Sequence, residues 1–338
     1  MELQTIIKNI QNKLDHEYKK RLYRNLVFKG GGIRGIAYLG AMDVLEEYQI
    51  LGNIERVAGA SAGAIAATLL SFRQSLEVTN AYFNSLDFKN VPQRHTKEHA
   101  LRFLDSMDNA CYERFFKNYG WYSSKYFHEW LEAIIATQCG GNGRATFADF
   151  HERGFRDLYV VAANLSRHRA ETFSFKDTPD VAVADAVRLS MSIPLFFEAL
   201  QFDGKNLGSG DYYVDGGLYD NFPMHIFDHP DFEKNNWAFN DNINWQTLGL
   251  FLFPEQIKTP QEPEMPDEVW DFLSLLLRNL SNAHQMSSYQ TNPVDRHRTI
   301  EISDCGISPV EFDIEPESER YIELYNSGQT AVRQFFGE

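Results

Sequence analysis

Short apolar runs, glycine-rich turns and helical patterns follow one another along the N-terminal part of the chain. Residues 26–28 and 56–58 form short, mostly apolar runs that indicate buried strands. Each run leads through glycine into a pattern of apolar residues at helical spacing, over residues 33–48 and 62–72. Strand, glycine turn and helix in repetition are typical of an α/β fold with a parallel sheet.

The same pattern predicts further elements downstream. Buried strands are expected at residues 158–163, 212–214, 248–253 and 299–302. Helices are expected at residues 1–22, at 181–189, from 267 onward and at 316–336, with Pro316 suited to the first turn of the last one.

Residues 80–145 differ from their surroundings, because they are polar and aromatic and end in the glycine-rich run 140–143. We interpret them as a helical cap inserted into a single domain. We expect residues 1–24 to form an N-terminal helix and residues 25–225 to form a core that contains the cap. Residues 226–338 then complete the same domain.

The composition is that of a globular protein with an acidic charge. The 338 residues include 47 acidic residues and 32 Lys or Arg, a net charge of −15. A general nucleic-acid binder normally carries a basic surface, so we expect no nucleic-acid partner. Three cysteines are too few and too widely spaced for a disulfide framework or a paired metal motif: Cys111, Cys139 and Cys305. Neither a secretory leader pattern nor a membrane-spanning apolar run is visible, so we expect a cytoplasmic location.

A candidate nucleophile lies in residues 59–63, G-A-S-A-G, which fit the pattern G-x-S-x-G. A strand is predicted before this motif and a helix after it, as required for a sharp turn that exposes Ser61. The small residues leave room for the turn, and the helix N-terminus offers N–H groups to a developing oxyanion. A helix-capping serine is the alternative, but the flanking strand and helix favour a nucleophile.

A glycine block, K-G-G-G-I-R-G at residues 29–35, also follows a strand and opens a helix. It formally fits the dinucleotide-binding pattern G-x-G-x-x-G, so a nucleotide-binding regulatory module is one alternative. That site needs an acidic residue at the end of the next strand, but this strand ends in the serine motif, and Glu55 lies at its start. Backbone N–H groups of the glycines, beside Arg34, suit an oxyanion hole better.

A third block is V-D-G-G at residues 214–217, where a predicted strand ends at Asp215 and two glycines leave it accessible. An ordinary Asp-Gly turn has the same sequence, so this signal is weak by itself. Together, the three blocks resemble the patatin-like phospholipase family, of the bacterial type, over about residues 25–225. The serine-rich block of that family, which ends in proline, is matched by S-M-S-I-P at residues 190–194, and Asn221 and Pro223 follow the aspartate as in the family.

The resemblance implies a three-layer α/β/α sandwich with a mostly parallel central sheet, and a Ser–Asp dyad without histidine. In this dyad Ser61 is the nucleophile and Asp215 the general base, and no metal or cofactor takes part. The implied oxyanion hole consists of Gly30, Gly31, Gly32, Arg34 and the Ala62 N–H. The glycines that shape the motifs are Gly59, Gly63, Gly216 and Gly217.

The activity implied by the resemblance is the hydrolysis of fatty-acyl esters of phospholipids, of phospholipase A or lysophospholipase type, through an acyl-enzyme. A free aspartate, with a pKa near ~3.9, is a weak base. The dyad therefore requires Asp215 to be buried in a dry cleft, which would raise its pKa.

A Ser–His–Asp esterase of α/β-hydrolase type is a second alternative, because the triad residues of that fold follow the order Ser, Asp, His. Four histidines follow Asp215 in the chain: His225, His229, His284 and His297. The D-G-G block favours the dyad over this triad. Residues 95–99, H-T-K-E-H, fit a metalloprotease pattern but lie in a polar stretch, and we interpret them as a surface helix.

Lipid contact has two candidate regions, each with a simpler packing explanation. The helix from residue 267 has an apolar face that suits either lipid or the core. The aromatic residues of the cap either line an acyl pocket or fill a satellite core: Phe103, Phe115, Phe116, Trp121, Tyr122 and Trp130.

The charge is unevenly distributed along the chain. Residues 1–34 carry a net charge of +5, whereas residues 255–338 carry −10. The net negative charge disfavours tight binding to anionic lipid, whereas its uneven distribution permits transient membrane contact through the basic end, weakened by salt. A capped site is also compatible with a small-molecule or protein activator, although no motif identifies one.

Overall fold

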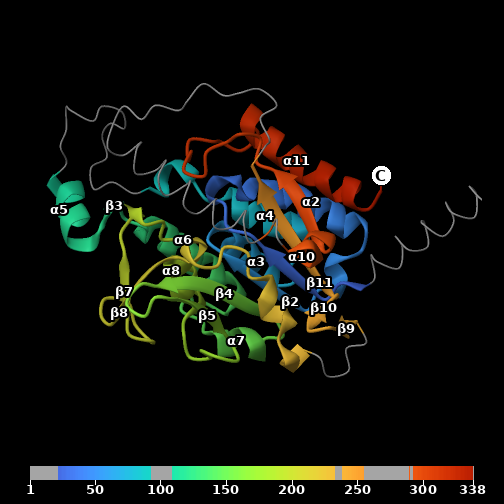
Figure 1. Ribbon diagram of the computed structural model, residues 1–338. Coiled ribbons are helices and arrows are strands. Elements are labelled where there is room, and N and C mark those ends of the chain that lie inside the picture. Colours follow the sequence, from blue (N-terminus) through green and yellow to red (C-terminus); the bar gives the residue numbers. More distant parts are fainter. Residues whose placement is uncertain (1–21, 93–108, 233–237, 255–288, 290–291, 338) are drawn as a thin grey trace, which may run out of the picture.

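The computed structural model describes residues 22–92, 109–232, 238–254, 289 and 292–337. Its centre is an eight-stranded sheet in which the strands pair in the order β12-β11-β1-β2-β4-β8-β7, and β5 also pairs with β4 (Figure 1). The strands are β1 (Asn25–Phe28), β2 (Arg56–Ala60), β4 (Asp157–Asn164), β5 (Arg169–Ser174), β7 (Leu200–Phe202), β8 (Asp211–Asp215), β11 (Thr247–Phe253) and β12 (Thr299–Ser303). Two further ribbons pair β3 (Gly120–Tyr122) with β6 (Leu195–Phe197) and β9 (Phe239–Asn240) with β10 (Ile243–Asn244).

Five strands of the sheet, from β12 to β4, are parallel, and β5, β7 and β8 run antiparallel to their neighbours. The pairing register along β4 determines where β2 and β8 end. Ala60 of β2 pairs with Val161, and Asp215 of β8 pairs with Ala162. Because Val161 and Ala162 both also pair with β5, β2 and β8 must share the other side of β4, end to end. Residue 61 and Asp215 are thereby brought together at one point of the sheet.

Helices cover one face of the sheet, and alternate side chains of each strand point to opposite faces. In β1, Leu26 and Phe28 enter the large core beneath the helices, whereas Val27 enters a smaller core on the opposite face. That smaller core includes Met224 and Phe227 of the short helical segment η5 (Met224–Asp228). The fold is therefore an α/β fold with a mostly parallel sheet, as predicted.

The helices on the large core include α2 (Ile36–Glu47), α3 (Ala62–Ser71), α8 (Val183–Ser190) and α11 (Glu319–Phe335). The segment predicted as a cap contains part of α4 (Leu76–Asn84), then η3 (Phe88–Asn90), α5 (Asn109–Asn118), β3 and α6 (Lys125–Gln138). Figure 1 shows α5 at one end of the molecule, and α6 packs on α8. The remaining short elements are η1 (Gly32–Gly35), η2 (Leu51–Asn53), α7 (Phe147–Glu152), η4 (Gly216–Leu218), η6 (Pro230–Phe232) and α10 (Pro293–His297).

The predicted strands are confirmed, but two helix starts are wrong. The last helix begins after Ser318, whose side chain accepts a hydrogen bond from the Tyr321 N–H at 3.4 Å, so a serine cap and not Pro316 begins it. The helix expected over residues 33–48 is divided into the 3₁₀ turn η1 and α2. The predictions for residues 1–21, for residues 95–99 and for the helix from 267 lie outside the described residues. None of the described helices is both long enough and apolar enough to span a bilayer.

Helix α11 lies against α2, and two glycines allow the close approach (Figure 1). A Cβ atom on Gly40 would lie 1.9 Å from the Tyr325 carbonyl oxygen, and one on Gly328 would lie 1.9 Å from that of Ala37. Each helix therefore presents bare backbone where the other crosses it.

The substitution Gly328→Ala should destabilise the fold by about 2 kcal/mol or more, because the added methyl forces α11 away from α2. Helix propensity alone would favour alanine by about 1 kcal/mol, so a net loss identifies the packing effect. Urea denaturation measures the free energy of unfolding, and Thr330→Ala, at an exposed position of the same helix, is the control. A Gly328→Ala protein as stable as the wild type would contradict the close crossing.

Candidate active site

Ser61 occupies a sharp turn between β2 and α3. Its backbone angles, φ 54° and ψ −127°, lie where residues other than glycine are strained. The neighbouring glycines make the turn sterically possible. A Cβ atom on Gly59 would lie 2.3 Å from the Gly63 carbonyl carbon, and one on Gly63 would lie 2.3 Å from the Phe28 carbonyl oxygen. The G-x-S-x-G motif thus forms a strained strand-to-helix elbow.

Ser190, at the end of α8, holds the elbow through a hydrogen bond. The Ser61 N–H donates to Ser190 Oγ at 2.9 Å, and this hydroxyl donates to the Val161 carbonyl at 2.6 Å. Ser190 therefore ties the strained residue to the central strand β4. The sequence showed the serine-rich block at residues 190–194, but no local pattern indicated which of its serines bonds to the elbow.

Asp215 is buried at the end of β8, where only 7% of it is exposed, as a base of raised pKa requires. Its N–H donates to the Ser192 carbonyl at 2.8 Å, and its Oδ1 accepts from the Gly217 N–H at 2.7 Å. Burial raises the pKa of Asp215 to about 6, although the facing Ser61 side chain and the Gly217 N–H both lower it. The carboxyl group therefore interacts with Ser61 and ionises close to neutral pH.

The two glycines after Asp215 let it approach β4 closely. A Cβ atom on Gly216 would lie 2.1 Å from the Val161 carbonyl oxygen, and Gly217 supplies the N–H that holds the carboxylate. Both residues belong to the short turn η4.

The glycine loop, residues 30–32, lies directly beside Ser61. A Cβ atom on Gly30 would be 3.0 Å from Ser61 Cβ. The Gly30 N–H donates to the Asn221 carbonyl at 3.0 Å, and Asn221 Nδ2 donates back to the Gly30 carbonyl at 3.2 Å, so this amide is already used. Within the described residues, the N–H groups of Gly31 and Gly32 form no hydrogen bond with the protein. Ala62 begins α3 next to Ser61, where helix N–H groups lack intrahelical acceptors.

Arg34 binds the glycine loop through its side chain. Its Nε donates to the Gly31 carbonyl at 2.9 Å, and its Nη1 lies 2.7 Å from Asp304 Oδ2. The guanidinium therefore holds the glycine loop from outside, a role that the sequence did not indicate because Asp304 is 270 positions away.

An apolar cavity of about 40 Å³ ends at the elbow. It is lined by Gly32, Ile33, Ser61, Ala62, Ile65, Phe83, Leu86, Phe88, Val91, Phe127, Met191, Ile193, Phe197 and Phe312. None of the described cap aromatics named above as pocket candidates lines it, and Phe103 lies outside the described residues. Three other aromatic residues of the predicted cap line the cavity, from α4, η3 and α6: Phe83, Phe88 and Phe127.

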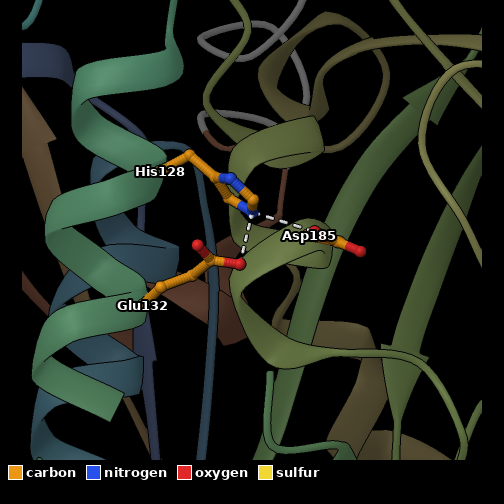
Figure 2. Close-up of side chains that lie close together, drawn as sticks. All are labelled: His128, Glu132 and Asp185. Atoms are coloured by element: carbon orange, nitrogen blue, oxygen red, sulfur yellow. Dashed lines mark hydrogen bonds and ion pairs between the residues drawn. The ribbon is translucent and has the colours of Figure 1, made fainter. Parts of the chain in front are cut away.

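A buried polar cluster joins α6 to α8 on the cap side (Figure 2). His128 Nε2 lies 2.9 Å from Asp185 Oδ1 and 3.8 Å from Glu132 Oε1, an arrangement that could ligate a cation. Arg144, however, donates to both Asp185 oxygens, at 2.8 and 2.5 Å, and lies 3.2 Å from Glu132 Oε1. A cation would have to displace this guanidinium, so we interpret the cluster as a link between α6, which carries Phe127, and α8, which carries Ser190.

The described histidines offer no partner for a triad. His225, His229 and His297 are exposed, and the two former lie near Asp220 and Asp231. Across the described part of the chain, neither Ser61 nor Asp215 forms a hydrogen bond with a histidine. His284 lies outside the described residues.

A serine at a strand-to-helix elbow of an α/β fold is an architecture of hydrolases. A family model of patatin-like phospholipases matches residues 26–228. The chain therefore belongs to the patatin-like phospholipase family, and it is a lipid ester hydrolase.

Similar proteins come from viruses and bacteria. The chain is 25% identical to protein R571 of Acanthamoeba polyphaga mimivirus over 327 residues, which cover 96% of this chain and 97% of the relative. It is 26% identical over 215 residues to probable lipid hydrolase 463L of Invertebrate iridescent virus 6, covering 64% of this chain and 67% of the relative. The crystal structure of VipD from Legionella pneumophila shares the fold, with a TM-score of 0.57 at 17% identity over 93% of this chain and 67% of that one.

Ionisation of the buried Asp215 carboxyl group should lower the stability of the fold at neutral pH. Because the pKa of Asp215 is raised from 3.8 to about 6, the folded state binds its proton more tightly than the unfolded state. The cost is absent below pH 4 and reaches about 3 kcal/mol above pH 6. The substitution Asp215→Asn should therefore raise the free energy of unfolding at pH 8 by up to about 3 kcal/mol, and not at pH 4.

Denaturant unfolding at both pH values measures this difference. The exposed Asp180→Asn is the control and should change stability equally little at either pH. An Asp215→Asn protein with the same gain in stability at pH 4 as at pH 8 would contradict the raised pKa.

Proposed function

We propose that the protein is a serine acyl hydrolase that cleaves fatty-acyl esters of phospholipids through a Ser61–Asp215 dyad and an acyl-enzyme. The observation that carries the proposal is a strained, buried serine that faces a buried carboxylate at the end of an apolar cavity. The apolar lining of the cavity suits contact with the part of an acyl chain nearest the ester, and the carboxylate suits a base that works near neutral pH.

The first half of the reaction makes the acyl-enzyme. The Ser61 hydroxyl loses its proton to Asp215 while its oxygen attacks the ester carbonyl carbon. The negative charge that develops on the carbonyl oxygen needs donors already in place, and the amides of Gly31, Gly32 and Ala62 are the nearest candidates. The proton then passes from Asp215 to the leaving alcohol, a lysophospholipid, as the carbon–oxygen bond breaks.

The second half releases the fatty acid. Asp215 accepts a proton from water, and the resulting hydroxide attacks the ester bond to Ser61. Collapse of the tetrahedral intermediate returns the proton to Ser61 Oγ and frees the acid. Each proton that Asp215 takes up is given back within the cycle, so no metal or cofactor enters this scheme.

Access to lipid is the remaining part of the proposal. The basic N-terminal side would allow transient contact with a membrane at low salt, and an activator could act on the cap segment, which contributes Phe83, Phe88 and Phe127 to the cavity lining. A Ser–His–Asp mechanism and a nucleotide-binding role remain the alternatives. The exposure of His225, His229 and His297 weighs against the triad. The serine elbow, which stands where a dinucleotide site has its ribose-binding acid, weighs against nucleotide binding.

Removal of either dyad residue should abolish hydrolysis. With phosphatidylcholine vesicles as substrate and released fatty acid as the readout, Ser61→Ala and Asp215→Ala should each lose at least about 1000-fold in kcat. Four single His→Gln variants, at positions 225, 229, 284 and 297, are the controls and should retain activity. Wild-type turnover in either dyad variant would refute the proposal, and loss in one histidine variant would favour the triad.

The rate should depend on pH through the Asp215 carboxylate. Since the basic form is required and burial raises the pKa to about 6, kcat/KM should rise about 10-fold between pH 5 and pH 7 and then level off. A pH series with a soluble ester, 4-nitrophenyl butyrate, measures this. A midpoint at or below pH 4 would show that Asp215 is not the titrating base.

The cavity should select for acyl length. The substitution Leu86→Trp adds bulk to its lining and should reduce the turnover of long-chain esters at least about 10-fold while short-chain esters are little affected. A series of 4-nitrophenyl esters from butyrate to palmitate measures the profile. Phe116→Trp, at an exposed position outside the cavity, is the control. An unchanged profile in Leu86→Trp would mean that the acyl chain binds elsewhere.

A further inference from the structure

The clamp segment, residues 304–312, comes from the end of β12 and lies outside the range matched by the family model. It begins with Asp304, whose position is determined by several bonds of its own. The Asp304 N–H donates to the Phe253 carbonyl at 2.9 Å, and its Oδ1 accepts from the Gly306 N–H at 3.1 Å. Only 7% of its side chain is exposed, so Oδ2 pairs with Arg34 largely out of solvent.

The clamp segment also touches the glycine loop through its backbone. The Ile33 N–H donates to the Pro309 carbonyl at 3.1 Å. Gly32 has a φ of +60°, and a Cβ atom there would lie 1.9 Å from the same carbonyl oxygen. Further along, Phe312 lines the cavity and stacks on Phe196 with ring centroids 5.8 Å apart. The proposed oxyanion loop is therefore in direct contact with the clamp segment.

The peptide group between Gly31 and Gly32 can adopt two orientations that differ by a flip, and only one of them presents an N–H group to an oxyanion. In a planar trans peptide the C=O and the N–H point in opposite directions. Arg34 holds the Gly31 carbonyl on its own side, so the Gly32 N–H is directed to the other side. Both flanking residues are glycines, which tolerate the angles of the flipped peptide as readily as the observed ones. A flip would present a carbonyl oxygen where the N–H now lies.

We propose that Asp304 is a positioning residue for the reaction, acting through Arg34 to keep the Gly31–Gly32 peptide in the orientation that directs its N–H toward the Ser61 site. This inference rests on the proposed function, because it assumes an oxyanion at that site. Arg34 then acts on the loop and not on the substrate.

The charges around Arg34 agree with this role. Lys29 is also buried at this edge of the sheet, with its Nζ donating to the Leu252 carbonyl at 3.0 Å and lying 4.6 Å from the centre of the Phe251 ring. Burial and the nearby Arg34 lower the pKa of Lys29 to about 7, whereas Asp304 raises it. Asp304 therefore stabilises two buried cations, and Arg34 would lose its neutralising partner without it.

The test uses the full chain with 4-nitrophenyl butyrate, a soluble ester that requires no membrane. Asp304→Asn should lower kcat at least about 10-fold with KM within about 2-fold of the wild type, because the loss concerns the transition state and not ester binding. Arg34→Lys keeps a cation opposite Asp304 but loses the Nε donor to the Gly31 carbonyl, and it should show the same split. This second variant decides the matter if Asp304→Asn does not fold.

Asp228→Asn is the matched control. Asp228 forms a comparable ion pair with the buried Arg298, at 2.5 and 2.7 Å, remote in sequence from the glycine loop. The Asp228→Asn protein should have a lower free energy of unfolding than the wild type, but its kcat should not fall selectively. A wild-type kcat in Asp304→Asn, or an equal fall in Asp228→Asn, would overturn the positioning role. Hydrolysis that is absent from the wild type, or unchanged in Ser61→Ala, would instead refute the proposed function itself.

Discussion

The strained backbone at Ser61 is the constraint on which the rest of the site depends. A left-handed conformation at a residue other than glycine costs of order 1–3 kcal/mol and persists only when its surroundings hold it. Here the surroundings are the two glycines of the motif, the hydroxyl of Ser190 and the pairing of β2 with β4. These contacts come from β2, β4, α3 and α8. The elements that hold the elbow are therefore the same ones that form the sheet and the large core.

Burial has two opposite effects at this site. The packing that excludes water around β4 and β8 stabilises the sheet, but it also removes solvent from the Asp215 carboxylate and raises its pKa. The fold therefore tolerates a loss of stability at neutral pH, where the proposed base Asp215 is ionised. The cavity extends the same dry environment to the place where an acyl chain would lie.

Much of the fold could be predicted from the sequence, because β1, β4 and β11 are apolar runs and the turns are punctuated by glycine, whereas β5 and β7 were not predicted. The three motifs could be recognised for the same reason: each is a local pattern with a steric cause. Contacts between distant residues could not be predicted. The bond from Asn221 to Gly30 and the pairing of Arg34 with Asp304 join segments that only the strand order brings together. The cap contributes Phe83, Phe88 and Phe127 to the cavity lining, but the sequence could not show which cap aromatics do so, because an apolar residue at helical spacing has the same pattern whether it lines a cavity or fills the core.

The strand order has a consequence for how the protein is made. β1 lies between β2 and β11, so the strand that leads into the glycine loop lacks one neighbour until residues 247–253 have been synthesised. The segment that contacts the loop follows some fifty residues later still. A chain emerging from the ribosome thus carries its serine motif long before the loop beside it is supported. Because the sheet is assembled from such distant segments, the hydrolytic site cannot be completed until nearly the whole domain has been synthesised and can fold.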